Sequence, residues 1–235
     1  MRNSQRVMAA LLGGIVVLLI VAAVWIKVTA PSVPELTGQR TSRSYDYTGF
    51  TGVSVSGEWQ VTIERGAAWR VAIDVPAEIV DRVRVERSGD ELTLGYESRG
   101  WSFGPFGRAV ESPQATITMP AIKMIVLSGT STLSFTGFEG DRLSLTSSGA
   151  SEVRAATGRF DNLELKLSGA GNVDLDEVVA INADVQVSGA GNVKLNMGGG
   201  RLTGHMSGAG NLDYRGTVSE QSVMTSGIVN VRRRD

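Results

Sequence analysis

Apolar and polar residues alternate along most of the second half of the chain. Around a recurring Ser-Gly pair, the positions one and three residues before the serine and five and seven residues after it are mostly apolar. At Ser168 these positions hold Leu165, Leu167, Val173 and Leu175. A period of two residues is typical of β-strands with one buried face. The pattern therefore predicts two short strands, one before and one after a Ser-Gly corner.

The Ser-Gly pair recurs at an almost constant interval. Successive serines are 20, 20, 20, 19 and 19 residues apart, at Ser128, Ser148, Ser168, Ser188, Ser207 and Ser226. A fixed period of this length indicates stacked coils, and it is too short for a repeat with two strands and a helix. We expect an all-β, single-stranded β-helix (a β-solenoid) with the right-handed winding of parallel crossovers. A set of hairpins is the weaker alternative, because Asn-Gly and Asp-Gly turns do not occur between the strands.

Two outward columns of the repeat carry polar residues. Four residues after the serine stand Asn172, Asn192, Asn211 and Asn230. Stacked amides at strand spacing can bond to one another along the axis, so we interpret this column as a structural ladder. A row of asparagines that binds a ligand is the alternative.

The second outward column, six residues after the serine, alternates in charge. It holds Arg154, Asp174, Lys194, Asp213 and Arg232. Opposite charges on neighbouring strands attract and like charges repel, so this order favours one register of the coils on a solvated face.

Three segments flank or cap these coils. Residues 44–121 also alternate as strands but lack the repeat, so we expect an irregular part that caps the solenoid coils of residues 122–231. Residues 28–43 are rich in Pro, Ser and Thr and form a predicted linker. Residues 232–235 form a basic tail. Arg233 falls on an inward column, so the last strand should fray there, and the arginines should discourage end-to-end stacking.

The N-terminal segment has the length of a membrane span. Residues 7–26 carry no charge, and twenty apolar residues cross a bilayer core as a helix. A cleaved signal peptide is the alternative, but its apolar region is shorter, about 7–15 residues. We expect residues 1–27 to be an anchor of a single-pass cell-membrane protein, with the β domain outside the cytoplasm, in the periplasm or on the cell surface.

The loop Gly100–Arg108 concentrates aromatic residues among glycines. Trp101, Phe103 and Phe106 could form a contact surface for sugar rings, a partner protein or the membrane. Alternatively, the rings fold back over the core of the solenoid as a plug.

Composition argues against several classes of chemistry. The chain has no cysteine and a single histidine, His205, so His/Cys metal sites are excluded. No phosphate loop or dinucleotide motif occurs, and we expect no cofactor. Residues 28–235 carry 20 basic and 24 acidic residues without a basic patch, which excludes a nucleic-acid partner. The acids of the repeat alternate with Lys and Arg, so we expect no catalytic site and no enzyme activity.

The repeated Ser-Gly-Ala-Gly-Asn motifs carry a resemblance to a known family. Together with Met119-Pro120 before the first repeat and the segment Val53–Ile63, they resemble the head GIN domain family of putative auto-transporter adhesins over residues 44–231. The resemblance implies a β-helix in a bacterial envelope or secreted protein, and it supplies no catalytic residues. We expect a membrane-tethered binding or adhesin-like module whose partner is a cell-surface glycan or an envelope protein. A polysaccharide-active enzyme and a structural, self-associating envelope protein are the alternatives.

Overall fold

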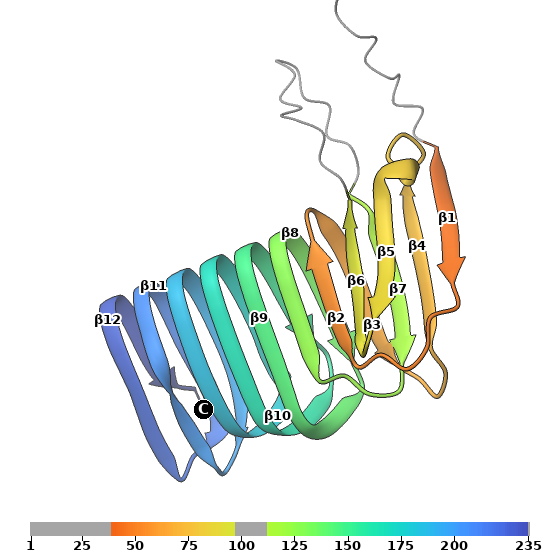
Figure 1. Cartoon of the computed structure of the whole chain (residues 1–235). Helices are drawn as coiled ribbons and strands as arrows, with labels where there is room; N and C mark the ends of the chain where they lie inside the picture. Colours follow the sequence, from red (N-terminus) through yellow and green to blue (C-terminus); the bar gives the residue numbers. More distant parts are fainter. Residues whose placement is uncertain (1–38, 97–111, 235) are drawn as a thin grey trace, which may run out of the picture. The chain divides into compact units, whose positions relative to one another are not determined.

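Parallel strands stacked coil upon coil make up most of the described chain (Figure 1). The computed structural model describes residues 39–96 and 112–234, which lie in a single unit, Gly38–Asp235. The predicted membrane segment 7–26 lies outside these ranges. Within them, no helix has the length and apolar character needed to cross a membrane.

Within residues 39–96 and 112–234, all but one of the regular elements are strands. A 3-10 helix, η1 (Val80–Arg82), is the exception. The strands, in chain order, are β1 Arg40–Tyr45, β2 Gly52–Ser56, β3 Trp59–Arg65, β4 Arg70–Pro76, β5 Val83–Ser88, β6 Glu91–Tyr96, β7 Gln114–Met119, β8 Met124–Thr136, β9 Phe138–Ala155, β10 Gly158–Gly198, β11 Arg201–Thr217 and β12 Glu220–Arg233.

Strands β8 to β12 form the predicted solenoid in the predicted register. Each pairs in parallel with the next, and the serines of the repeat lie side by side, as in Ser128 with Ser148 and Ser207 with Ser226. β10 is long enough to supply two successive coils, those of Ser168 and Ser188. The β-solenoid is therefore confirmed, and its right-handed winding stays a prediction.

A seventh Ser-Gly pair joins the same stack. β2 pairs in parallel with β8 and places Ser56 beside Ser128. Gly57 has a positive φ of 96°, like the other corner glycines. Val53 and Ile63 occupy the inward columns of this coil, three residues before and seven after Ser56, and both are buried. The half of the chain expected to be irregular thus contains a regular coil.

The order of the coils in space differs from their order in the chain. β6 pairs with β2 and β7 pairs with β3, both in parallel, so β6 and β7 form a coil on the side of β2 and β3 that faces away from β8. β2 and β3 come first in the chain but form the second coil of the stack. The chain then runs through β4 and β5, forms the first coil with β6 and β7, and continues into β8, which pairs with β2 and β3 on their other side.

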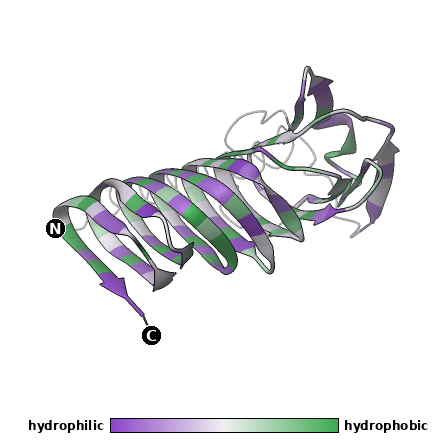
Figure 2. Ribbon diagram, turned by 90° about the horizontal axis from the view of Figure 1, so that it is seen from below, coloured by the Kyte–Doolittle hydropathy of each residue, from purple (hydrophilic) through white to green (hydrophobic). Residues whose placement is uncertain are grey.

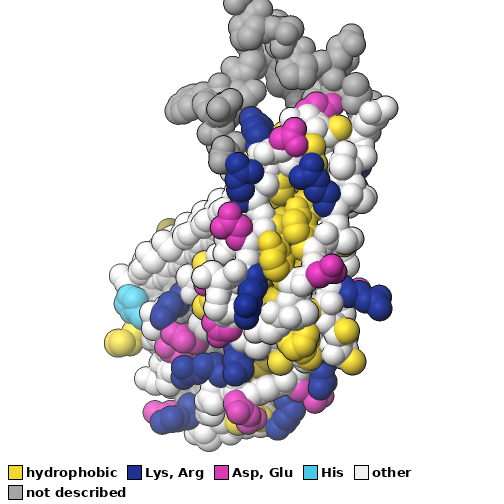
Figure 3. Space-filling model, turned by 45° about the vertical axis from the view of Figure 1, so that its right-hand side comes forward, with side chains coloured by type: hydrophobic (Ala, Val, Ile, Leu, Met, Phe, Trp, Pro, Cys, Tyr) yellow, Lys and Arg dark blue, Asp and Glu magenta, His cyan; other side chains and the backbone are white. Residues whose placement is uncertain are grey.

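Antiparallel strands close the N-terminal end of the stack. β1 pairs with β4, β4 with β7, and β5 with β6. The Tyr47 hydroxyl donates to the Val85 carbonyl at 3.1 Å, and Trp69 Nε1 donates to the Phe50 carbonyl at 2.9 Å. Figure 3 shows a strip of hydrophobic side chains on this part of the surface, bordered by charged ones. Antiparallel pairing thus covers the edges of β7 and β6, and leaves β1 and β5 as the outermost strands of the sheet.

The inward columns form one continuous core. Hydropathy alternates along every coil of the ribbon (Figure 2), and the inward side chains belong to a single buried cluster. Its largest fully buried members are Trp59, Phe50, Phe135, Phe138 and Phe160. Stacking the repeats thus buries a face that no single coil could bury alone.

The expected fraying at Arg233 is wrong. β12 pairs with β11 up to Tyr214 opposite Arg233. The flanking arginines are held by acids of earlier coils: Arg232 Nε lies 2.5 Å from Asp213 Oδ1, and Arg234 pairs with Asp176. These ion pairs hold the last strand in place, while the Arg233 side chain itself is exposed.

Candidate functional site

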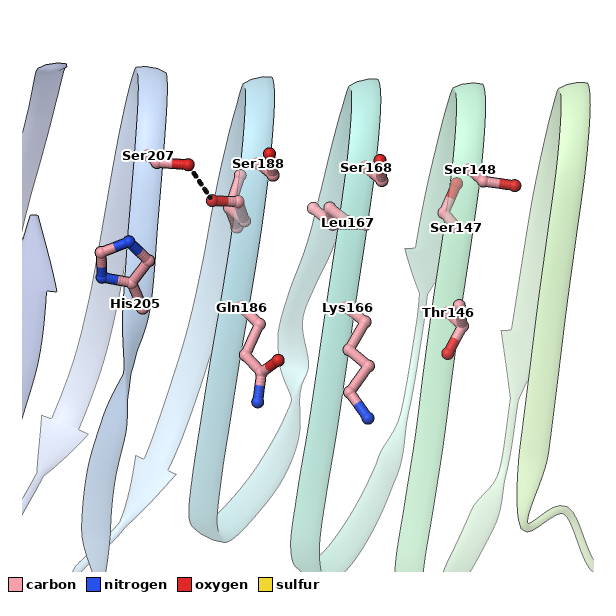
Figure 4. A pocket seen from close by; sticks show the side chains of 11 residues that line it. Thr146, Ser147, Ser148, Lys166, Leu167, Ser168, Gln186, Ser188, His205 and Ser207 are labelled. Carbon is pink, nitrogen blue, oxygen red and sulfur yellow. Dashed lines mark hydrogen bonds between the residues drawn. The ribbon is translucent and has the colours of Figure 1, made fainter. Parts of the chain in front are cut away.

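A shallow trough crosses four coils beside the row of corner serines (Figure 4). We call it the serine trough, and it encloses about 440 Å³. It is lined by Thr146, Ser147, Ser148, Lys166, Leu167, Ser168, Gln186, Val187, Ser188, His205 and Ser207. Each coil contributes its corner serine and the outward residue two positions earlier, because the parallel register stacks equivalent positions.

Three polar side chains of the serine trough form hydrogen bonds with neighbouring residues. Lys166 Nζ lies 2.5 Å from Glu164 Oε1, and Gln186 Nε2 donates to Asp184 Oδ2 at 3.1 Å. The Ser207 hydroxyl donates to the Val187 carbonyl at 3.5 Å. Long side chains fixed in this way lose less freedom when they bind a ligand.

The floor of the corner is built from the smallest side chains. Alanine and glycine of the repeated motif line a second trough next to the serines. Gly169 has a φ of +116°, and a Cβ there would lie 2.4 Å from the Gly149 carbonyl oxygen. The corner therefore requires glycine both for its backbone conformation and for the close approach of the coil beneath.

The asparagine column borders this floor. Asn192 Nδ2 donates to Asn172 Oδ1 at 3.0 Å, and Asn211 Nδ2 donates to Asn192 Oδ1 at 2.8 Å. Asn230 lies beside Asn211 in register, and no side-chain hydrogen bond joins the two within the described structure. Asn192 thus both donates and accepts along the axis, while Asn172 accepts and Asn211 donates.

A third trough follows the charged column on the far side of the asparagines. Lys194 Nζ lies 2.8 Å from Asp174 Oδ2, so two stacked neighbours pair as the alternation predicts. Arg154 pairs instead with Glu152 of its own coil, at 2.5 Å. Arg232, hydrogen-bonded to Asp213, holds the pKa of that carboxyl below its usual range. These acids are therefore held as charged partners of Lys and Arg.

The geometry around His205 does not resemble a nucleophilic triad. His205 is exposed in the serine trough, and the nearby Ser207 hydroxyl is bonded to a backbone carbonyl. The side chains that line this trough are hydroxyls, an amide, an amine, an imidazole and apolar groups. Among residues 39–96 and 112–234, no group of three or more His, Asp or Glu is placed to hold a metal ion.

The segment that contains the predicted aromatic contact residues connects to the described structure next to the Ser56-Gly57 corner. Three predicted contact residues lie outside the described ranges: Trp101, Phe103 and Phe106. At the two ends of that segment, Tyr96 Oη accepts from the Glu58 backbone amide at 3.3 Å, and the Ser112 hydroxyl donates to Glu58 Oε1 at 2.7 Å. Since Glu58 follows the Ser56-Gly57 corner, the chain leaves and re-enters the described structure there.

One signal of the site could have been found in the sequence. Ser56-Gly57 is the same dipeptide as the other corners, with apolar residues at the same four offsets. It falls outside the even spacing because a long insertion separates it from Ser128. The trough beside the serines could not be found in this way, because its shape depends on how far each outward side chain stands from the coil.

Comparison with known proteins agrees with this architecture. The family model described as "Putative auto-transporter adhesin, head GIN domain" matches residues 49–217 and 164–234. No curated protein matches. A putative adhesin from Bacteroides fragilis is similar in structure, with a TM-score of 0.60 at 14% identity over 85% of this chain and 99% of that one. A putative adhesin from Parabacteroides merdae has a TM-score of 0.50 at 13% identity, over 83% and 97%. The chain belongs to the head GIN domain family of putative auto-transporter adhesins.

Proposed function

We propose that the β-solenoid is an adhesin-like binding module that holds an extended glycan along the serine trough. The observation that carries the proposal is the repetition of one hydrogen-bonding set, a serine hydroxyl and an outward side chain, on four successive coils. Such a surface offers equivalent contacts at a spacing of about 4.8 Å along one line. An extended polymer with hydroxyl groups along its length matches that arrangement, whereas a small ligand would use only one coil.

Binding is favoured over catalysis by the placement of the carboxylates. A polysaccharide-active enzyme of the usual kind needs two carboxyl groups that flank the scissile bond. Glu164 and Asp184 point their oxygens at Lys166 and Gln186, which are the trough's own side chains. Asp174 and Asp213 pair with Lys194 and Arg232 along the charged column. This pattern supports ion pairing as their role.

The module would act outside the cytoplasm on a membrane tether. The uncharged stretch of residues 7–26 has the length of a membrane-spanning helix. The description of the family names the head domain of a putative adhesin. A tethered module with a trough open along its whole length can reach a polymer of the cell envelope from the side.

An array of glycans and cell-wall polymers tests the proposal with the full-length chain. The trough variant is Lys166→Ala/Gln186→Ala, which removes two exposed groups from its centre. The control is Arg159→Ala, which removes an exposed charged side chain outside all three troughs. A second arm uses Trp101→Ala/Phe106→Ala, because aromatic rings are common platforms for sugars and protein partners.

Each outcome of the array has a distinct meaning. Binding that the trough variant loses and the control keeps supports the proposal. Loss in the aromatic variant as well places Trp101 and Phe106 in the same binding surface. Binding that both variants keep rejects the trough, and a folded protein that binds no glycan shifts the function to an envelope-protein partner.

A further inference from the structure

The C-terminal coil exposes apolar side chains that the other coils do not. Among the described residues, the large hydrophobic side chains with high exposure are Met224, at 67%, and Ile228, at 84%. Both lie on β12. One coil earlier, the same two columns hold His205 and Ala209. The change to Met and Ile is therefore confined to the last coil.

The inward side of the same coil is also incompletely covered. Val223, Val229 and Val231 pack against the core but are only partly buried, whereas Leu212 of the coil before is fully buried. β12 stands at the end of the sheet order and pairs with β11 on one side (Figure 1). A strand edge with apolar residues on both faces is a template for another strand.

We propose that a second copy of this chain pairs with β12, antiparallel, about a two-fold axis through Gly227. An isologous antiparallel pair must match inward with inward positions, so its axis passes through a residue and not between two. Gly227 is chosen because it is the positive-φ glycine of the Ser-Gly corner in this coil. An axis at Gly227 places Val223 of each copy opposite Val231 of the other, and Met224 opposite Asn230. The two cores then become continuous across the axis.

Charge is complementary in this register. Glu220 makes no ion pair within the described structure. In the dimer it lies opposite Arg234 and diagonal to Arg232 of the other copy. Positions 232–234 of each copy face positions 220–222 of the other, so the arginines of the two copies lie at opposite ends of the pair and do not meet.

The assembly closes at two copies. An isologous pair uses the β12 edge of both copies, so no β12 edge is left for a third copy. At the other end of the stack the outermost strands are β1 and β5, which pair antiparallel with β4 and β6 and take no part in this interface. Pairing of C-terminal ends therefore yields a dimer with the two N-terminal caps at opposite ends.

The mass of the full-length chain in a mild detergent tests the proposal. Sedimentation equilibrium is run from low to high micromolar concentration on the native chain, on Met224→Lys/Ile228→Lys, and on the matched control His205→Lys/Ala209→Lys. All four positions are exposed, so the folds are kept. We expect the native chain and the control to reach twice the monomer mass and the β12 variant to stay monomeric. A monomeric native chain, or a β12 variant that still dimerises, overturns the proposal.

Cross-linking tests the register. The chain has no cysteine, so Met224→Cys/Asn230→Cys introduces the only thiols, at positions that face each other across the axis. Directly opposed strand residues are close enough for a disulfide. Oxidation should give a covalent dimer, and His205→Cys/Asn211→Cys, one coil earlier, should not. A variant that stays monomeric on a non-reducing gel, or a control that cross-links equally, contradicts the register.

Discussion

Gly169→Ala would test whether the corner of each coil depends on glycine. Gly169 has a φ of +116°, which side chains rarely adopt, and its Cβ would lie 2.4 Å from the Gly149 carbonyl oxygen. The contact is with backbone, so no side chain can rotate away. The same corner contains a matched control in Gly171, which lacks a positive φ and whose Cβ would lie 3.2 Å from its nearest neighbours.

The expected cost has two parts. A left-handed backbone costs a residue with a Cβ about 1–2 kcal/mol. Relieving the overlap must also push two coils apart locally, which weakens one or two backbone hydrogen bonds at about 1 kcal/mol each. We therefore expect Gly169→Ala to lower the free energy of unfolding by about 3 kcal/mol. Gly171→Ala needs a shift of only a few tenths of an ångström, so its cost should stay below about 1 kcal/mol.

Urea unfolding of the full-length chain, followed by circular dichroism, measures both values. The comparison requires equal m-values, because coils of a repeat protein can unfold separately. If Gly169→Ala destabilises no more than Gly171→Ala, then backbone conformation and coil spacing do not explain the glycine column.

Further predictions concern the ladder, the charged column and the core. Asn192→Ala removes two ladder hydrogen bonds that are exposed to water, so it should lower the free energy of unfolding by about 1 kcal/mol in urea; no change would exclude a stabilising ladder. Because Arg232 lowers the pKa of Asp213 in the folded state, their pair stabilises the fold above the ordinary carboxyl pKa, about 4, and this contribution is lost as the pH falls further. Asp213→Asn should flatten the acid side of a stability–pH profile, and an unchanged slope would refute the link. Trp59→Ala should cost about 3–5 kcal/mol in thermal unfolding because Trp59 is fully buried in the core, and a loss below 1 kcal/mol would contradict that.

The repeated coils could be predicted from the sequence because each corner carries its own local signal. A Ser-Gly pair and four apolar offsets recur, and parallel strands in register need little else. The order of the first two coils could not be predicted in this way. β6 and β7 fit against β2 and β3 only after the chain has passed through β4 and β5, and no local pattern encodes that return.

The polar columns around the candidate site could also be predicted only in part from the sequence. The asparagine column could be read from spacing alone, since three of its members bond as stacked amides. The partner of Arg154 could not, because Glu152 of its own coil competes with Asp174 of the next for the guanidinium. Which acid is chosen depends on side-chain reach rather than on position in the repeat.

Ligand length distinguishes a glycan that lies along the serine trough from a ligand that occupies a single coil. Calorimetric titration of the full-length chain would use oligosaccharides of increasing length from whichever glycan binds on the array. The four coils of the trough span about 14 Å from first to last at about 4.8 Å per step. We expect affinity to rise with length until the ligand covers that span and then to level off, and Lys166→Ala/Gln186→Ala to remove the rise. A monosaccharide that binds as tightly as the longest oligomer would show that the ligand does not extend along the four coils.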